Sequence, residues 1–349
     1  MPSDSHLASH PAQPPRPLAG RRAWLITDGK IGMDVQVRGV ADALGLDAEM
    51  KHVAPTGVHR FLSPWLPPAG GERIGTGGLL SAPWPDIVLA TGRLSIPYLR
   101  AVRRRAGAGT YTVILQDPKT GIGSADLIWV PAHDKLRGAN VITTPTAPHS
   151  FTQARIAALR AKVPPEIAVL PSPRIAIMLG GRSGDYPYSD ASHRRLAASL
   201  TSLAALGASF LITPSRRTHP ELLATVDAAT ASNPRILWRD QSQNPGPNPY
   251  PDFLAQADML IATADSVNMS SEITATGRPA YVFIPAGGSP KFNRFHAALQ
   301  TSGAARALPD HFTALETWTY PPHDAGAIIA AEIEKRFAVR ASGAARQSV

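Results

Sequence analysis

Two loops in the second half of the chain combine glycine, serine and arginine as a diphosphate site requires. Gly180-Gly181-Arg182-Ser183 follows a short apolar run. Its two glycines would let the backbone approach an anion, and the arginine would add a bidentate positive charge. Ser215 and Arg216 lie in the loop after the next apolar run. These loops predict an anion-binding site, with a plain glycine turn as the alternative interpretation of the first.

A third loop, residues 263–272, is the richest in polar side chains. Asp265 or Ser266 can cap a following helix, and Ser270 and Ser271 fall in its first turns, where free backbone N–H groups attract anions. Glu272 comes next, and its carboxylate could accept hydrogen bonds from the vicinal hydroxyls of a ribose. Capping alone would explain Asp265 and Ser266, and a solvated side chain is the alternative for Glu272.

The first half of the chain also has loops of this kind. Gly29, Lys30 and Gly32 follow the first apolar run and precede a helical pattern, and Gly92 and Arg93 follow a later run. They predict contacts with an acceptor or a phosphate group. The first loop matches neither a Walker A sequence nor a dinucleotide fingerprint, so a tight strand–helix turn is the alternative.

Three side chains of the first half are candidates for a general base. Asp28 and Asp117 come directly after predicted strands, and His133 follows a third. A group transfer to a hydroxyl needs such a base within hydrogen-bond reach of that hydroxyl. The sequence does not choose among the three, and a structural role is the alternative for His133.

These loops are positioned by short apolar runs that alternate with amphipathic stretches. The runs are continuously apolar, as in parallel strands covered on both faces. The predicted strands are 23–27, 86–91, 111–116, 127–130, 174–179, 209–213, 235–238, 259–263 and 280–284. The stretches at 35–44, 96–105, 192–206, 267–276 and 325–339 predict helices. The sequence therefore predicts an α/β fold with two Rossmann-like, doubly wound parallel sheets whose strand ends face a shared cleft.

A proline-rich segment suggests where the two domains divide. Residues 163–173 contain four prolines, which favour a linker. We predict a disordered tail at 1–20, an N-terminal Rossmann-like domain at 21–162, a C-terminal Rossmann-like domain at 174–322, and a C-terminal helix and tail at 323–349.

The composition excludes several classes of site and favours an anionic partner. The 349 residues include no cysteine, which excludes a thiol nucleophile and a Cys-ligated metal site. Residues 1–160 carry 18 basic against 11 acidic side chains, a bias that suits an anionic partner. No motif indicates nucleic-acid binding, and no apolar run approaches the ~20 residues of a membrane span. We expect a cytoplasmic protein with no cofactor and no metal.

One segment suggests contact with a membrane surface. Phe61 and Trp65 lie beside Arg60 in a long loop rich in proline and glycine, residues 54–83. Such a segment could dip into an anionic membrane interface and reach a lipid acceptor, which would place the protein peripherally at the inner face of the membrane. Packing beneath the domain is the alternative.

Taken in order, these motifs resemble one known family. GGRSGD, TPSRRT, TADSVNMSSE, GRPAYVF and KFNRFH in the second half, with DGKIGMDVQVRGVADALGL, ATGRLSIPYLR, QDPK and HDKLRGANVITT in the first, resemble bacterial relatives of the plant mitochondrial-fission "elongated mitochondria" proteins. The resemblance spans residues 22–305 and implies a glycosyltransferase-B-like fold. More distantly, the Ser/Glu helix resembles the donor site of nucleotide-sugar glycosyltransferases, which implies that Glu272 would hold the donor ribose.

The sequence thus predicts a metal-independent, glycosyltransferase-like protein. It would bind a nucleotide-diphosphate sugar in its second domain, 174–322, and transfer the sugar to a lipid or envelope acceptor presented by its first domain, 21–162. A transfer that inverts stereochemistry would use one of the three base candidates. Two alternatives stay open: a nucleotide-sugar epimerase, which needs no acceptor, and a non-catalytic adaptor of the same fold linked to fission or to the envelope.

Overall fold

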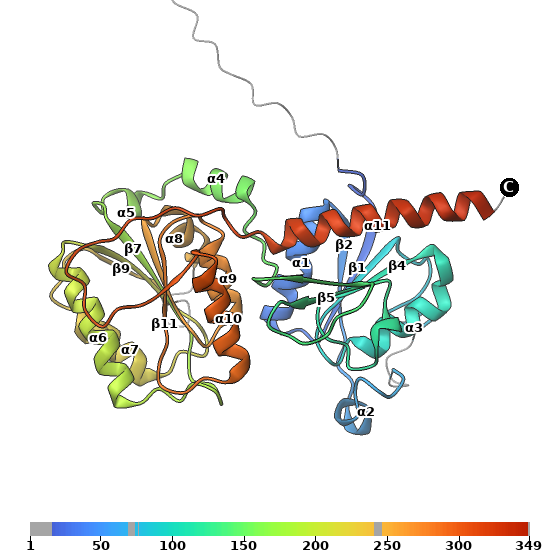
Figure 1. Cartoon of the computed structure of the whole chain (residues 1–349), viewed down its shortest axis with the longest axis horizontal. Helices are drawn as coiled ribbons and strands as arrows, with labels where there is room; N and C mark the ends of the chain where they lie inside the picture. Colours follow the sequence, from blue (N-terminus) through green and yellow to red (C-terminus); the bar gives the residue numbers. More distant parts are fainter. Residues whose placement is uncertain (1–15, 69–73, 76, 241–245, 348–349) are drawn as a thin grey trace, which may run out of the picture.

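The chain forms two sheets, each of six parallel strands, with helices packed around them (Figure 1). The computed structural model describes residues 16–68, 74–75, 77–240 and 246–347. The strands of the first sheet are β1 (Arg22–Thr27), β2 (Asp47–His52), β3 (Ile87–Ala90), β4 (Tyr111–Ile114), β5 (Leu127–Pro131) and β6 (Val141–Thr144). Those of the second are β7 (Arg174–Leu179), β8 (Ser209–Pro214), β9 (Ile236–Trp238), β10 (Met259–Thr263), β11 (Ala280–Phe283) and β12 (Arg306–Ala307).

Helices connect and cover these strands. Those of the first half are α1 (Ile31–Leu44), α2 (Gly57–Phe61), α3 (Ile96–Ala106), α4 (Gln153–Ala161) and α5 (Pro165–Ala168). Those of the second half are α6 (Asp190–Ala205), α7 (Pro220–Thr230), α8 (Tyr250–Gln256), α9 (Val267–Thr274), α10 (Pro290–Thr301) and α11 (Ala325–Gln347). The short 3-10 turns Gly107–Gly109 and Ile122–Ser124 complete the described elements.

The strand orders confirm the predicted fold class. The first sheet runs β2-β1-β3-β4-β5-β6, the flavodoxin-like order, and the second runs β12-β11-β10-β7-β8-β9, which is the Rossmann order 3-2-1-4-5-6 read from the other edge. Every strand pairing within the two sheets is parallel. The central strands are buried along nearly their whole length, as continuous apolar runs require.

Strands β2, β6 and β12 were not predicted from the sequence. β2 and β12 are edge strands without a continuously apolar run, since β2 reads Asp-Ala-Glu-Met-Lys-His and β12 is only two residues long. β6 lies at the other edge of the first sheet, and three of its four residues are only half-buried. Edge strands carry fewer buried side chains, so the periodicity that identifies central strands is weak in them.

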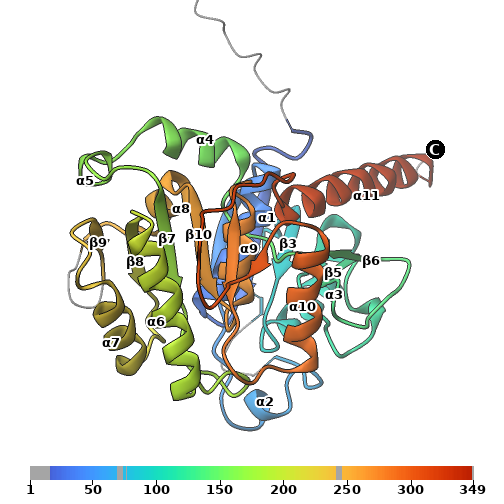
Figure 2. The ribbon, with the colours of Figure 1, turned by 60° about the vertical axis from the view of Figure 1, so that its left-hand side comes forward.

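The chain crosses between the two halves twice. Helix α4 precedes the proline-rich segment but packs against α8 of the second half, where Arg160 donates to the carbonyls of Ala255 and Thr276. Helix α5 lies inside that segment. At the other end, α11 returns to the first half and packs against α1, with Ile329 and Ile333 buried in the first core (Figures 1 and 2).

The N-terminal segment is partly described. Residues 1–15 of the predicted tail lie outside the described residues, whereas Leu18 is buried in the core of the first sheet. Within the described part of the chain, no helix is both long enough and apolar enough to cross a membrane.

Candidate functional site

The predicted site residues lie at the carboxyl ends of the strands in both sheets. In an open parallel sheet, ligands bind where the strand order reverses, because the two neighbouring loops diverge there. That point lies between β7 and β10 in the second sheet and between β1 and β3 in the first. The loops after these four strands contain Gly180, Asp265, Asp28 and Gly92.

Asp265 is the centre of the second-sheet switch point. Its side chain is fully buried and accepts hydrogen bonds from the backbone N–H of Gly181 at 2.9 Å, from Tyr188 at 3.1 Å and from Thr263 at 2.7 Å. Arg217 completes the set with an ion pair of 3.1 Å. Desolvation of the Tyr188 phenol, with the nearby Asp265 charge, raises the pKa of that phenol far above its usual range.

This network changes the interpretation of the glycine loop. The N–H of Gly180 donates to Thr263 and that of Gly181 donates to Asp265, so both amides that were expected to cradle a diphosphate already have protein acceptors. The glycines are required for packing instead, because a Cβ on Gly181 would lie 1.8 Å from the carbonyl oxygen of Arg217. The hydroxyls of Ser183 and Ser215 also bond within their own loops.

Two predicted arginines keep their charges available at this edge. Arg182 is half-exposed and lies 3.8 Å from the exposed Glu221, a loose contact. Arg216 is exposed, and its neighbour Arg217 is the residue that neutralises Asp265. Arg182 and Arg216 are therefore the two predicted arginines whose charges are not used to neutralise Asp265.

Helix α9 begins beside this network. Ser266 caps it by accepting from the N–H of Met269, as predicted. Ser271 is buried and accepts from the N–H of Ala147 of the first domain at 3.0 Å. Ser270 is fully buried, and its hydroxyl finds no partner among the described residues.

Glu272 is buried rather than open to a ribose. Its carboxylate accepts a hydrogen bond of 2.5 Å from the Tyr250 hydroxyl of α8, and only 7% of the residue is exposed. Burial raises the pKa of Glu272, while the bond from Tyr250 and the charge of Arg155 act in the opposite direction. In this conformation the carboxylate joins α9 to α8.

At the first-sheet switch point, Asp28 faces Gly92. Asp28 pairs with the exposed Lys30 through Oδ2 at 2.5 Å, while Oδ1 is enclosed and has no hydrogen-bond partner among the described residues. A Cβ on Gly92 would lie 3.5 Å from that enclosed oxygen. Gly29 donates to Thr27, and Gly92 donates to the side chain of Gln116.

The other two base candidates have partners that limit them. Both carboxylate oxygens of Asp117 accept hydrogen bonds from Lys119, and this pairing, with the charge of Lys291, lowers the pKa of Asp117 against the effect of its burial. His133 is buried, and its ring packs edge-on against Phe295 of α10 with 5.5 Å between ring centres. Desolvation and nearby positive charges lower the pKa of His133 to about 4.

Arg93 does not point toward an anion site. Its guanidinium donates to the carbonyls of Arg60, Phe61 and Ser63, at the end of α2 and just beyond it. It thereby braces α2, which projects from the first domain at the lower edge of both views (Figures 1 and 2).

The two domains meet through these same loops. Asn268 of α9 donates to the carbonyl of Gly32 at 3.2 Å and accepts from Gln36 of α1 at 3.1 Å. A Cβ on Gly32 would lie 2.8 Å from the side-chain nitrogen of Asn268, so a larger residue here would displace that amide. At the β5 end, Lys291 pairs with Asp134 at 3.3 Å.

A group that was not predicted lies at the ends of β1 and β2. Asp34 of α1 accepts from Thr27 at 2.5 Å and bonds to Nε2 of His52 at 3.1 Å. The sequence holds one weak signal for this group, the acidic Asp34 two residues after the predicted first loop. β2 has no continuously apolar run, so the sequence does not predict that His52 ends a strand.

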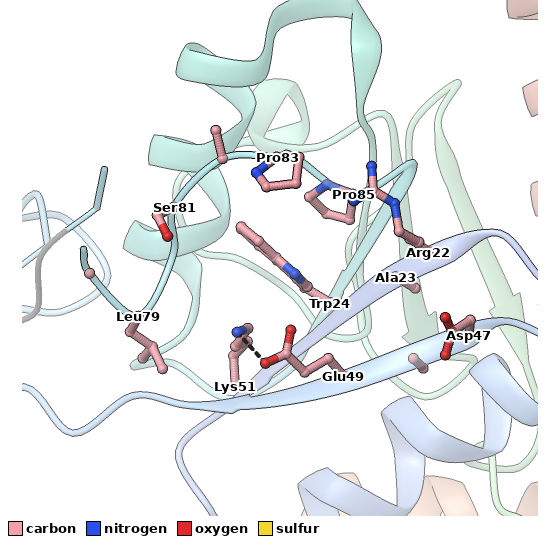
Figure 3. A pocket seen from close by; sticks show the side chains of 13 residues that line it. Arg22, Ala23, Trp24, Asp47, Glu49, Lys51, Leu79, Ser81, Pro83 and Pro85 are labelled. Carbon is pink, nitrogen blue, oxygen red and sulfur yellow. Dashed lines mark hydrogen bonds and ion pairs between the residues drawn. The ribbon is translucent and has the colours of Figure 1, made fainter. Parts of the chain in front are cut away.

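One cavity of about 430 Å³ lies on the face of the first sheet instead of at the strand ends (Figure 3). It is lined by β1, β2 and residues 78–85, with Trp24, Pro83 and the Lys51–Glu49 ion pair among its walls. None of the predicted site residues lines it.

Comparisons with known proteins agree with the resemblance noted from the motifs. The family model described as "Mitochondrial fission ELM1" matches residues 31–337. The mitochondrial fission protein ELM1 of Arabidopsis thaliana is 26% identical over 92% of each chain.

Solved structures with a similar course of the chain have low sequence identity. The glycosyltransferase SnogD of Streptomyces nogalater is 15% identical, with a TM-score of 0.49 over 94% of this chain and 99% of its own. A putative UDP-N-acetylglucosamine 2-epimerase of Listeria monocytogenes is 13% identical, also at 0.49, over 91% and 97%. Because the family model covers most of the sequence, the chain belongs to the mitochondrial fission ELM1 family.

Proposed function

We propose that the protein binds a nucleotide-diphosphate sugar at the second-sheet switch point and transfers the sugar to an acceptor held by the first domain. The observation that carries this proposal is the unequal distribution of charge at the strand ends. In the second domain, Arg182 and Arg216 are exposed in the loops after β7 and β8. Among the described residues, Arg182 makes only a loose contact of 3.8 Å with Glu221. In the first domain, Lys30 and Lys119 are each paired with a neighbouring aspartate.

This distribution suits an anionic donor on one side and a neutral hydroxyl acceptor on the other. Breaking the bond to a sugar leaves charge on the departing diphosphate, and fixed cations at the strand ends stabilise that charge. Arg182 and Arg216 would supply the cations, and the N-terminus of α9 would add its free N–H groups. No metal is needed for this step.

The segment formed by α2 and the residues up to Trp65, here called the aromatic tip, favours a lipid as the acceptor. Helix α2 buries none of its residues, and Phe61 and Trp65 are 79% and 63% exposed. Arg93 holds this segment through three carbonyls, so the aromatic side chains are presented on a braced loop. Exposed Phe and Trp beside Arg60 suit the interface of an anionic membrane.

A second candidate function is a non-catalytic adaptor. It is favoured by the internal bonding at the switch point, where the amides of Gly180 and Gly181 and the carboxylate of Glu272 all have protein partners. A protein that kept the fold but no longer bound a nucleotide-sugar would need no unpaired hydrogen-bonding groups at the second-sheet switch point. An epimerase would be separated from a transferase by turnover of a nucleotide-sugar without an acceptor.

Calorimetric titration with UDP, GDP, ADP and CMP, without metal, tests the proposal. We expect one nucleotide to bind, and Arg182→Ala and Arg216→Ala each to weaken that binding about tenfold or more, because each removes a charge-assisted contact. Arg104→Ala is the matched control, since Arg104 is an exposed arginine at the far end of α3. Binding of none of the four would favour the adaptor.

A further inference from the structure

The proposed transfer needs a base that an acceptor hydroxyl can reach, and the three candidates named from the sequence do not offer one. Asp117 has both oxygens bonded to Lys119. His133 is buried against Phe295, in a setting that disfavours its protonated form. Asp28 has one oxygen paired with Lys30 and the other enclosed.

His52 differs from all three candidates because its side chain is held by a hydrogen bond and is also accessible to a ligand. It is the last residue of β2, and 53% of its side chain is exposed. Its Nε2 lies 3.1 Å from Oδ2 of Asp34. A carboxylate only accepts hydrogen bonds, so Nε2 carries a proton, and in the neutral ring Nδ1 then keeps a lone pair. Among the described residues, no hydrogen bond reaches Nδ1.

Asp34 is itself held in place by the loop after β1. Its Oδ1 accepts from the buried hydroxyl of Thr27, and Thr27 in turn accepts from the N–H of Gly29. The His52 ring packs over Gly29, where a Cβ would lie 3.8 Å from the ring. The chain of bonds therefore fixes His52 relative to the loop that also carries Asp28 and Lys30.

This group lies at the edge where the domains meet. Asp34 is in the first turn of α1, between Gly32 and Gln36, both of which contact Asn268 of the second domain. His52 is one strand away from the first-sheet switch point. A hydroxyl held at this edge of the first domain would meet the free nitrogen of His52.

We propose that His52 is the general base of the transfer and that Asp34 is its positioning residue; this inference rests on the proposed function. The acceptor O–H bond breaks as its proton moves to Nδ1, and the oxygen forms a bond to the anomeric carbon. The bond from that carbon to the diphosphate oxygen breaks, and its electron pair leaves with the nucleoside diphosphate. The imidazolium then releases its proton to solvent.

The first test is spectroscopic and needs no substrate. In ¹⁵N NMR of the neutral ring, assigned with His52→Gln, the wild type should show the proton on Nε2. In Asp34→Asn the amide oxygen can accept from Thr27 while the NH₂ group donates to His52, so the proton should move to Nδ1. A wild-type ring protonated on Nδ1, or a tautomer unchanged in Asp34→Asn, would overturn the arrangement.

The second test measures release of nucleoside diphosphate from UDP-glucose, UDP-N-acetylglucosamine, GDP-mannose and ADP-glucose, with water as acceptor. His52→Ala should slow release about a hundredfold or more while nucleotide affinity stays within twofold of the wild type. Added imidazole should restore part of the rate, which a merely structural histidine would not allow. The exposed His311→Gln should behave as the wild type.

The outcomes separate the two proposals. If the wild type binds a nucleotide and turns over a sugar, and His52→Ala does so equally fast, the base assignment is wrong and the donor site stands. Nucleotide binding without turnover of any of the four donors also rejects the base and leaves the donor site. If no nucleotide binds, the proposed function fails and the base assignment fails with it.

Discussion

The carboxylate of Asp265 lies against the backbone of Gly180, where a Cβ would be 2.3 Å from both carboxylate oxygens. The two residues are 85 positions apart in the sequence, and their contact joins the loops after β7 and β10 across the switch point. Because Arg217 already neutralises Asp265, an anion arriving here would draw its positive charge from Arg182 and Arg216. The contact therefore bears on both stability and binding.

Gly180→Ala should destabilise the second domain. The added methyl group would displace a buried, fully bonded carboxylate, and overpacking of this kind costs about 1–3 kcal/mol. Urea denaturation measures the loss. Gly184→Ala is the matched control in the same loop, because nothing lies within 4 Å of a Cβ there. Equal effects of the two substitutions would contradict the assigned contact.

The pair Glu272 and Tyr250 should make stability depend on pH. Burial raises the folded-state pKa of Glu272 above the value of an unfolded chain, so the native state binds the proton more tightly. Stability contributed by the protonated form is then lost as pH rises from about 4.5 through the folded pKa. Glu272→Gln cannot ionise. Its free energy of unfolding, relative to that of the wild type, should therefore increase as pH rises toward neutral.

Tyr250→Phe provides the complementary measurement for this pair. It removes the hydrogen bond that stabilises the Glu272 carboxylate, so the loss of stability with rising pH should be steeper than in the wild type. Chemical denaturation from pH 4 to 8 compares the three proteins. Parallel curves for all three would show that the Glu272 carboxylate is not buried as described.

Helix α11 should stabilise the first domain through single side chains. Ile329 is fully buried in the first core, whereas its neighbour Ile328 is 53% exposed. Ile329→Ala should cost about 2–5 kcal/mol of unfolding free energy. Ile328→Ala makes the same chemical change one residue away and should stay within about 0.5 kcal/mol of the wild type. Similar losses would mean that α11 does not dock as described.

The sequence was sufficient to predict the strands that are completely buried. β3 and β4 are apolar at nearly every position because both faces are covered, so their pattern identifies them without knowledge of their partners. β2 has polar residues at alternate positions because it is an edge strand, so its sequence does not identify it as a strand or His52 as the residue at its end. A site residue at a strand end can therefore be predicted from the sequence only where the strand before it has a distinctive apolar pattern.

Side-chain partners from distant parts of the chain could not be predicted in this way. Arg93 was expected to bind an anion, but carbonyls more than 30 positions away bind its guanidinium. Glu272 was expected to accept hydrogen bonds from a ribose, but its carboxylate accepts one from the Tyr250 hydroxyl of α8. Residue type and spacing along one loop indicate what a side chain can bind, whereas the packing of other elements decides what it does bind.

The aromatic tip should bind anionic membranes. Phe61→Ser with Trp65→Ser should lower co-sedimentation with phosphatidylglycerol-containing vesicles at low salt about tenfold or more, because two large apolar side chains no longer leave water. Val169→Ser is the control, since Val169 is as exposed as Phe61 but lies in the segment between α5 and β7. Wild-type protein that stays in the supernatant would refute the membrane contact.

His133 should make the domain contact sensitive to acid. Desolvation lowers its folded pKa from 6.5 to about 4, so the unfolded chain takes up a proton that the native state resists. Stability associated with the neutral ring is then complete above pH 6.5 and is lost as pH falls toward 4, by about 3 kcal/mol in total. His133→Phe keeps a ring against Phe295 without this titration. The difference in unfolding free energy between wild type and His133→Phe should therefore change across this range. Buried histidines that do not interact with His133 contribute equally to both proteins. A difference that stays constant from pH 7 to pH 4 would therefore show that His133 is already protonated or solvated in the folded chain.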